Sequence, residues 1–142
     1  MSDIYSKRKR SDIMSKISSK NTKLEITFRK LLFAHGFRYR IHPKSMPGKP
    51  DIYLPKYRMA IFLNGCFWHG HEGCKSAKLP QTNRSFWNNK ISENIERDKR
   101  VVKELEEENI ETIIVWQCEI SSKAKLNDKL QHVLSALYKH TH

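Results

Sequence analysis

Two cysteines and two histidines lie close together in the segment Cys66-Phe67-Trp68-His69-Gly70-His71-Glu72-Gly73-Cys74. It holds two of the chain's three cysteines and two of its seven histidines. Thiolates and imidazoles at such short separations are ligands of tetrahedral zinc, which takes its fourth ligand from elsewhere in the chain. The remaining cysteine, Cys118, is the candidate for that position. The spacing therefore predicts a zinc site made of Cys66, His71, Cys74 and Cys118.

Three other interpretations of the segment stay open. His69 could replace His71, because Cys-x2-His spacing suits zinc equally well. A disulfide between Cys66 and Cys74 is the second, but no apolar h-region follows the basic N-terminus. We therefore expect a reducing, cytoplasmic location inside the cell, where disulfides are rare. In the third interpretation the cysteines are buried as small apolar side chains.

The charge of the chain indicates a polyanionic partner. Its 142 residues suffice for one domain with a single core. Hydrophobic residues make up 38% and charged residues 30%, and no apolar run reaches the length of a membrane span. Lys and Arg number 27 against 15 acidic residues, a formal charge of +12. We expect nucleic acid as the partner first and an anionic membrane second, although charge alone says nothing about sequence specificity.

A basic arm begins the chain, with Lys7-Arg8-Lys9-Arg10 followed by Ile13, Met14 and Ile17 at helical spacing. Such an arm is often a solvated tail. A short basic helix with an apolar edge could instead lie along DNA and insert a side chain between bases. We assign residues 1–20 to this arm and residues 21–142 to the main domain.

The first half of the domain must position an acidic residue beside the Cys/His segment. Thr22 and Glu25 form a capping box for a helix over residues 22–35, which Gly36 ends. Phe37, Tyr39 and Ile41 then alternate with Arg38, Arg40 and His42, which predicts a strand over residues 37–42, and a turn rich in proline leads to Asp51. Residues 51–54 and 59–63 read as further strands, the second buried on both faces. Asp51 and the loop after Leu63 should therefore meet at one edge of the sheet.

The second half supplies a long helix over residues 84–108, with Ser85 as its N-cap, and a buried strand over residues 112–116. Charged residues 96–100 within that helix indicate an exposed ladder. Cys118 follows the strand, so it can reach back to the Cys/His segment, and a last amphipathic helix contains Leu126 to Leu137. The order helix, three strands, helix, strand, helix predicts a single α/β domain with a mixed central sheet flanked by helices.

Pro50-Asp51 at the start of a strand, after a helix that contains Glu25, resembles the restriction-endonuclease-like nuclease core. Such a core binds Mg2+, which prefers carboxylate, carbonyl and water oxygens and can stabilise phosphate charge. The usual second element, Glu or Asp, any residue, then Lys, is replaced here by Leu63-Asn64-Gly65.

A wider set of motifs resembles the very-short-patch repair endonucleases (Vsr family), over about residues 7 to 122. The resemblance implies an enzyme that nicks DNA 5′ to the thymine of a T:G mismatch, the product of 5-methylcytosine deamination. The motifs are Pro50-Asp51, Asn64-Gly65-Cys66-Phe67-Trp68-His69, His71 with Cys74, Phe86-Trp87, Lys90-Ile91, Asn94-Ile95-Glu96-Arg97-Asp98-Lys99-Arg100 and Val115-Trp116-Gln117-Cys118.

The resemblance also implies a role for each matching residue. Mg2+ would be held by Asp51 and the backbone carbonyl of Leu63, while His69 would activate water or relay its proton. Glu25 and Asp98 would hold metal-bound waters. The structural zinc ligands would be Cys66, His71, Cys74 and Cys118, which favours His71 over His69. The residues implied to contact DNA are Phe67, Trp68 and Met14, which would intercalate beside the mismatch, and Lys90 and Asn94, which would face the mispaired bases.

Partners follow from the resemblance too: double-stranded DNA with a T:G mismatch, a cytosine-5 DNA methyltransferase as a functional link, and mismatch-repair proteins. We expect a monomer without membrane attachment. Two departures from the family pattern stand out. Asn64 replaces a second active-site histidine; it can donate a hydrogen bond to phosphate but cannot take a proton. Glu72-Gly73 lengthens the zinc loop by one residue relative to some members.

Two other functions compete with this one. A non-catalytic, zinc-stabilised DNA- or RNA-binding module would use the same basic arm and zinc loop, with Asp51 and His69 merely structural. A related endonuclease would cut duplexes without preferring a mismatch.

Overall fold

Three strands form one mixed sheet in the order β1-β2-β3, where β2 pairs antiparallel with β1 and parallel with β3. The structure, a computed structural model, describes residues 22–139. Its elements are α2 (Thr22–Ala34), β1 (Ile52–Leu54), β2 (Met59–Asn64), α3 (Arg84–Glu107), β3 (Glu111–Trp116) and α4 (Lys123–Lys139), with short 3₁₀ helices at Pro55–Tyr57, Lys75–Ala77 and Gln117–Ile120. The single α/β domain with a mixed sheet is confirmed. The basic arm at residues 1–20, Met14 within it, and the side chain of Thr22 in the expected capping box lie outside this description.

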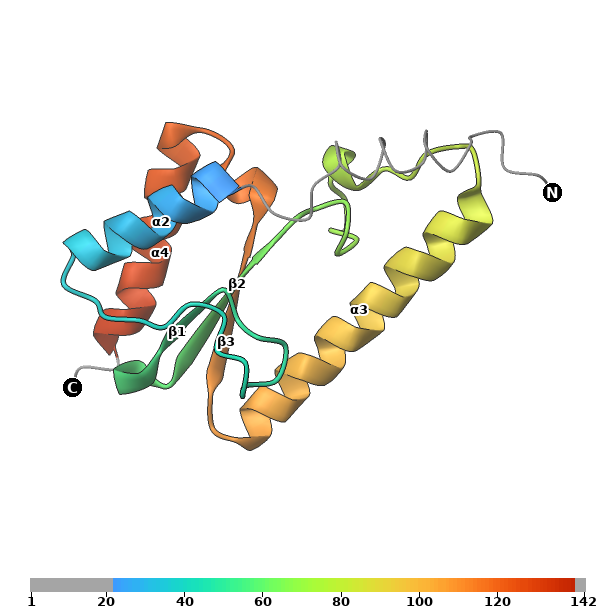
Figure 1. The fold of residues 1–142 in the computed structure, drawn as a ribbon. Helices are drawn as coiled ribbons and strands as arrows, with labels where there is room; N and C mark the ends of the chain where they lie inside the picture. The colour runs from blue at the N-terminus through green and yellow to red at the C-terminus, as the bar shows by residue number, and fades with distance from the viewer. Residues whose placement is uncertain (1–21, 140–142) are drawn as a thin grey trace.

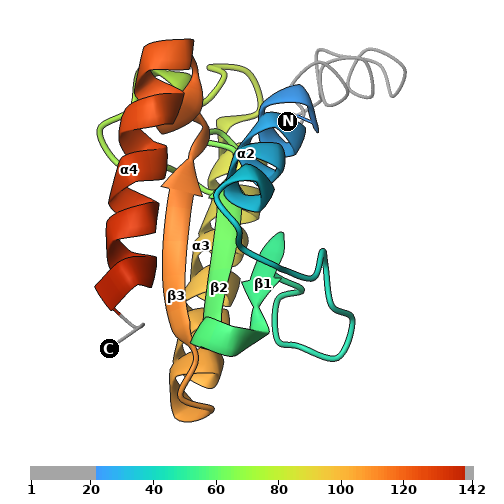
Figure 2. The ribbon, with the colours of Figure 1, turned by 90° about the vertical axis from the view of Figure 1, so that its left-hand side faces the viewer.

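The helices lie on both faces of the sheet. Figure 2 shows α2 and α4 covering the face toward the viewer, with α3 behind the strands. The main core lies between the sheet and helices α2 and α4, where Phe28, Leu32 and Leu137 are fully buried. A smaller cluster joins the sheet to the C-terminal half of α3 through Ala60 and Leu105. None of the helices within residues 22–139 combines the length and apolarity that crossing a membrane requires.

The N-terminal half of α3 extends beyond the sheet (Figure 1). The chain between β2 and α3 packs against this half, and its apolar contacts there form a third cluster with Phe67, Trp87 and Ile91 at its centre. The Cys/His segment is therefore fixed on one side by the strand ends and on the other by α3.

The structure tests the caps that were expected at the end of α2 and at the start of α3. Gly36, at φ +91°, ends α2 as expected; its N–H donates to Phe33 O at 2.9 Å and the next N–H donates to Leu32 O at 3.1 Å. Ser85 as the N-cap of α3 is wrong, because the helix begins at Arg84 and Asn83 precedes it at φ +56° without a side-chain cap bond.

The expected strand over residues 37–42 is also wrong. Only Arg40 pairs, through two N–H···O bonds of 2.8 Å with Tyr53 of β1. The apolar alternation fails at Ile41, which is 47% exposed, because the next residue, His42, takes the left-handed region at φ +47° and turns the chain. The sheet therefore has three strands within the described residues rather than four.

The loop after this turn passes very close to α3 at Gly48. Its φ is +72°, and a Cβ there would lie 2.4 Å from Val101 Cγ1. Only glycine fits both the conformation and the contact. The close approach carries the chain back to Asp51 at the start of β1.

Candidate functional site

The four residues predicted to bind zinc lie together. One donor atom from each of Cys66, His71, Cys74 and Cys118 lies within 4.8 Å of the others. Cys118 Sγ is 3.4 Å from His71 Nδ1, and the Cys118 N–H donates to Cys66 Sγ at 3.4 Å. All three cysteines are free thiols, so the structure contains no Cys66–Cys74 disulfide. This geometry completes the cluster with His71 rather than His69, and the cluster could hold a metal ion.

The parallel pairing of β2 and β3 explains why residues so distant in sequence meet. Asn64 of β2 is paired with Trp116 of β3 at the end of both strands. Cys66 and Cys118 each lie two residues beyond this pair, so both lie at the same edge of the sheet. The His71 ring stacks on Trp116, with centroids 4.1 Å apart and planes 10° apart, which fixes the orientation of the imidazole.

The thiols differ in their acidity. Burial raises the pKa of the Cys66 thiol to about 12, and burial also raises the pKa of Cys118. Hydrogen bonding to His71 lowers the pKa of Cys74 to about 7. A divalent cation would offset the cost of ionising the Cys66 and Cys118 thiols, because it coordinates thiolates directly.

A second cluster joins Glu25, His42 and Asp51, whose donor atoms also lie within 4.8 Å of one another. His42 Nε2 is 3.0 Å from Asp51 Oδ1 and 3.5 Å from Glu25 Oε1. The Leu63 N–H donates to Asp51 Oδ2 at 2.7 Å. This bond confirms that Asp51 and the end of β2 meet at one edge of the sheet.

The electrostatics of this cluster are unusual, because two carboxylic residues are buried side by side. Glu25 is 4% exposed and Asp51 is 7% exposed. Arg29 NH1, one turn along α2, lies 3.2 Å from Glu25 Oε1 and offsets part of the negative charge. Buried carboxylates at this separation repel each other, so the cluster favours an added cation.

Sequence reasoning missed His42. It was the last polar position of the expected strand over residues 37–42, where an alternating pattern gave it no separate role. A histidine immediately before a proline-rich turn that ends at Asp51 was the available signal. Only the fold shows that this turn returns His42 to the aspartate.

His69 and Asp51 face one cavity of about 380 Å³, which His42, Lys49, Leu63 and Asn64 also line. Asp98 of α3 holds the His69 ring, with Oδ2 2.6 Å from Nδ1. An ionised carboxylate can only accept, so beside ionised Asp98 the hydrogen lies on Nδ1, which leaves Nε2 of a neutral imidazole as an acceptor. The interpretation of residues 96–100 as an exposed ladder is therefore wrong for Asp98. The Glu96–Lys99 pair, at 3.9 Å and about three-quarters exposed, does fit it.

A much smaller cavity adjoins the second cluster. Its volume is about 10 Å³, and Glu25, Leu63 and Asn64 are among its lining residues. This is about the space that one water molecule needs, and its walls offer polar atoms to hold that water.

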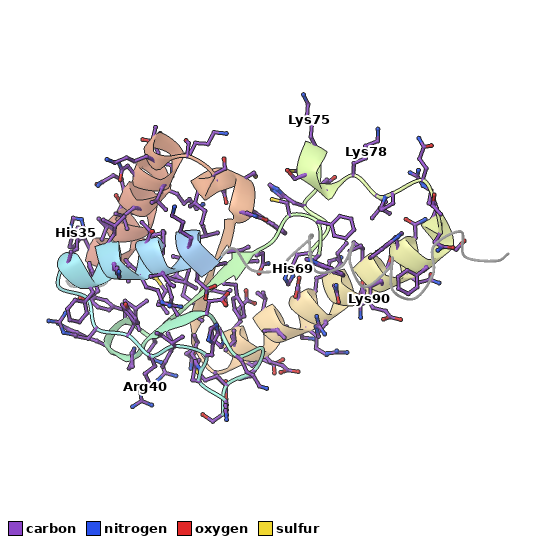
Figure 3. All side chains as sticks on the ribbon, turned by 45° about the horizontal axis from the view of Figure 1, so that its top comes forward. His35, Arg40, His69, Lys75, Lys78 and Lys90 are labelled. Atoms are coloured by element: carbon purple, nitrogen blue, oxygen red, sulfur yellow. The ribbon has the colours of Figure 1, made fainter. Side chains whose placement is uncertain are left out.

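The residues expected to face DNA differ in their accessibility. Phe67 is 7% exposed and Trp68 is half-buried, with their rings edge to face at 5.2 Å. Asn94 is 7% exposed, and its Nδ2 donates to the Trp68 carbonyl at 2.8 Å. Lys90 is exposed on the same helix, and Figure 3 shows it away from His69, toward the N-terminal end of α3. In this conformation Asn94 therefore supports the Trp68 loop, and Phe67 would have to leave its cluster to reach a base stack.

Comparison with known proteins gives matches over most of the chain. The family model described as DNA mismatch endonuclease Vsr matches residues 2–75. The type II nicking enzyme V.NmeAIP of Neisseria meningitidis serogroup A is 46% identical over 134 residues, which cover 94% of this chain and 95% of that protein. The type II nicking enzyme V.XorIIP of Xanthomonas oryzae pv. oryzae is 41% identical over 134 residues, covering 94% and 98%. The DNA mismatch endonuclease Vsr of Escherichia coli is 39% identical over 129 residues, covering 91% and 82%.

Proposed function

Because the chain belongs to the Vsr family of DNA mismatch endonucleases, we propose that it nicks one strand of duplex DNA 5′ to the thymine of a T:G mismatch. The observation that best supports this chemistry is the position of Asp51 and His69, which line one cavity at the end of β2. A metal-binding carboxylate and an imidazole on the same cavity can act on one phosphate. We also propose that β1, β2 and β3, with Asp51 at the start of β1, form a restriction-endonuclease-like core.

A strand-resolved cleavage assay with Mg2+ tests this proposal. Duplexes with a T:G pair in varied flanking sequence are compared with T:A and C:G duplexes of the same sequence. A nick 5′ to the thymine in T:G duplex alone is expected. Equal cleavage of matched duplexes would indicate an endonuclease without mismatch specificity, and no cleavage would indicate a binding module.

Asp51 and the Leu63 carbonyl would hold Mg2+, since a buried carboxylate and a carbonyl are hard oxygen ligands of the kind this ion prefers. Mg2+ bound there would stabilise the charge on the scissile phosphate. Glu25 would hold a water in the small cavity beside Leu63. The donor set fits the ion.

His69 would take the proton from the attacking water through Nε2, because Asp98 fixes the hydrogen on Nδ1. Asn64 lines the same cavity and is 6% exposed. It can donate to the phosphate but cannot accept a proton, so proton transfer falls to His69 alone. Asp98 would thus position His69 through Oδ2, and its expected role in holding a metal-bound water stays a prediction.

Replacing Asp98 with asparagine should lower the rate of the chemical step by about 10²-fold or more, because an amide can favour the wrong imidazole tautomer. Single-turnover nicking of T:G duplex measures this rate, and DNA affinity should stay within about twofold. The matched control is Glu96→Gln, which removes an exposed charge two residues away on α3. A rate for Asp98→Asn equal to that of the control would remove Asp98 from the mechanism.

We propose that the Cys/His cluster holds structural Zn2+. Three thiolates and one imidazole close a tetrahedral site and leave no open position for substrate. The ion would tie the ends of β2 and β3 together. It would thereby hold the loop that carries Phe67, Trp68 and His69.

The DNA-binding surface would combine the formal charge of +12 with the aromatic loop. A T:G wobble pair stacks poorly, so inserting a ring beside it costs less than at a matched pair. Selectivity can then come from deformability as well as from hydrogen bonds. Trp68 is already partly exposed and would insert first, followed by Phe67 and by Met14 from the arm, while Lys90 and Asn94 would contact the mispaired bases.

Replacing Trp68 with alanine should weaken binding to T:G duplex by about 5- to 100-fold, the range expected from losing one stacked ring. Affinity for matched duplex should fall by less than about threefold, because phosphate contacts supply most of it. Fluorescence anisotropy with both duplexes measures the two affinities. Tyr138→Ala, which removes an aromatic that is 49% exposed on α4, is the control. Equal losses on both duplexes would argue against intercalation.

We propose two kinds of cellular partner. A cytosine-5 DNA methyltransferase would create the 5-methylcytosine whose deamination supplies the mismatch, and mismatch-repair proteins would act at the same lesion. We propose that the protein acts as a monomer.

A further inference from the structure

His42 occupies a position that neither the zinc loop nor the expected Mg2+ ligands use. Its Nε2 lies 3.0 Å from Asp51 Oδ1 and 3.5 Å from Glu25 Oε1, so it bridges the two buried carboxylates. The three donor atoms lie within 4.8 Å of one another. Side-chain exposure is 5% for Glu25, 11% for Asp51 and 35% for His42, so the imidazole forms the accessible side of the cluster.

We propose that His42 is a nitrogen ligand of the divalent cation that Asp51 and the Leu63 carbonyl hold, with Glu25 beside it through its water, and that this site prefers Mn2+ to Mg2+. The geometry suits an octahedral ion. Ligands on adjacent corners lie about 3.0 Å apart when the bonds are about 2.1 Å long, and ligands on opposite corners lie about 4.2 Å apart. The 3.0 Å between His42 Nε2 and Asp51 Oδ1 matches ligands on adjacent corners. All three donor atoms lie within 4.8 Å of one another, which is compatible with adjacent or opposite corners.

The preference follows from the type of donor. Mg2+ selects oxygen ligands and gives up its water reluctantly, whereas an imidazole nitrogen suits transition-metal ions. Mn2+ accepts both carboxylates and imidazole and has the octahedral habit of Mg2+. Replacing one oxygen by the His42 nitrogen therefore strengthens Mn2+ binding more than Mg2+ binding.

The backbone supports a dedicated position for this ring. His42 has a φ of +47°, a conformation that costs energy for a residue with a Cβ. The His42 N–H donates to Pro50 O at 3.1 Å, and Pro50 is the residue next to Asp51. This bond closes the turn and directs His42 toward the carboxylates.

A simpler alternative is that His42 only offsets the charge of the carboxylates, as Arg29 does for Glu25. In that case the loss of His42 would weaken the binding of Mn2+ and of Mg2+ equally, because it would disorder the shared carboxylates. Direct coordination would instead change the ratio of the two affinities. The ratio therefore separates the two roles.

The test uses full-length protein loaded with one equivalent of zinc, so that the Cys/His cluster is filled before Mn2+ is added. Electron paramagnetic resonance follows free Mn2+ in a titration, and calorimetry follows Mg2+. His42→Gln should weaken Mn2+ binding by at least about tenfold, a loss that even outer partners of metal ligands can produce. Mg2+ binding should change by less than about threefold. The control, His35→Gln, changes an exposed histidine at the far end of α2 (Figure 3) and should leave both affinities unchanged.

Bound Mn2+ in the unmodified protein should also show ¹⁴N coupling in pulsed resonance spectra, which His42→Gln removes. The inference would be overturned if the variant kept its Mn2+ affinity or lost affinity for both ions equally. It would also be overturned if the unmodified protein showed no ¹⁴N coupling, a result that does not depend on whether the variant folds. The inference rests on the proposed function only in assigning this ion to DNA cleavage. Because no readout uses cleavage, a protein that binds Mn2+ through His42 but does not nick T:G duplex would overturn only the proposed function.

Discussion

Replacing Asp51 with alanine should abolish nicking of T:G duplex, with a loss of at least about 10³-fold in the single-turnover rate. The carboxylate is 7% exposed, faces the cavity that His69 lines, and lies beside Glu25 and His42. Without it the cavity loses the carboxylate ligand that is proposed to hold the cation together with the Leu63 carbonyl and His42.

Folding should survive this change. Removing one of two buried carboxylates relieves their repulsion, and this gain partly offsets the loss of the Asp51 contacts with His42 and the Leu63 N–H, so the fold should persist. The Leu63 N–H loses its 2.7 Å acceptor in Asp51→Ala, whereas Asp51→Asn can retain an acceptor there. Both variants should be inactive, and circular dichroism should report the native helix content for each.

The matched control is Asp128→Ala, which removes an exposed carboxylate of α4. It should nick T:G duplex at the normal rate. If Asp51→Ala cleaved within about tenfold of the unmodified protein, Asp51 would not be the metal ligand. A well-folded Asp51→Ala protein that still binds DNA but cannot nick it would exclude the purely structural role of Asp51 in a binding module.

The sequence best predicted those residues of the site whose positions are determined by the ends of strands. Cys66 and Cys118 each follow a buried apolar run, and parallel neighbouring strands place such residues at one edge. Asp51 was placed beside the end of β2 because it opens the strand before β2, and in an antiparallel pair the start of one strand lies next to the end of the other; the bond to the Leu63 N–H agrees. Local periodicity and turn residues were sufficient here, because each position is fixed by the strand next to it.

The sequence failed where a contact depends on a distant element. The motifs alone do not show that Phe67 packs against α3, or that Asn94 of α3 donates to the Trp68 carbonyl, so they do not reveal that both side chains are buried. The pairing of His69 with Asp98 spans 29 positions in the chain and has no local signal. The alternation in residues 37–42 indicated a strand, yet the turn at His42 permits only one bridge to β1. In each case tertiary packing overrode a local pattern.

Replacing Cys118 with serine should remove zinc and destabilise the fold by at least about 3 kcal/mol, a fraction of the roughly 10–16 kcal/mol that structural zinc contributes in zinc-finger peptides. Serine is a poor zinc ligand, and Cys118 is the residue through which β3 reaches the cluster. Zinc content by mass spectrometry should fall well below one ion per chain. Denaturant unfolding measures the change in free energy, and an unchanged zinc stoichiometry would contradict this ligand set.

A pair of histidine variants makes the assignment sharper. His71→Gln should lose zinc as Cys118→Ser does, because His71 Nδ1 faces the cluster at 3.4 Å from Cys118 Sγ. His69→Gln should keep its zinc and its stability but lose nicking, because this ring is held by Asp98 outside the cluster. If His69→Gln lost the zinc and His71→Gln kept it, the two histidines would have to exchange roles. The loop would then rotate about its strand ends, and the general base would no longer face the cavity of Asp51.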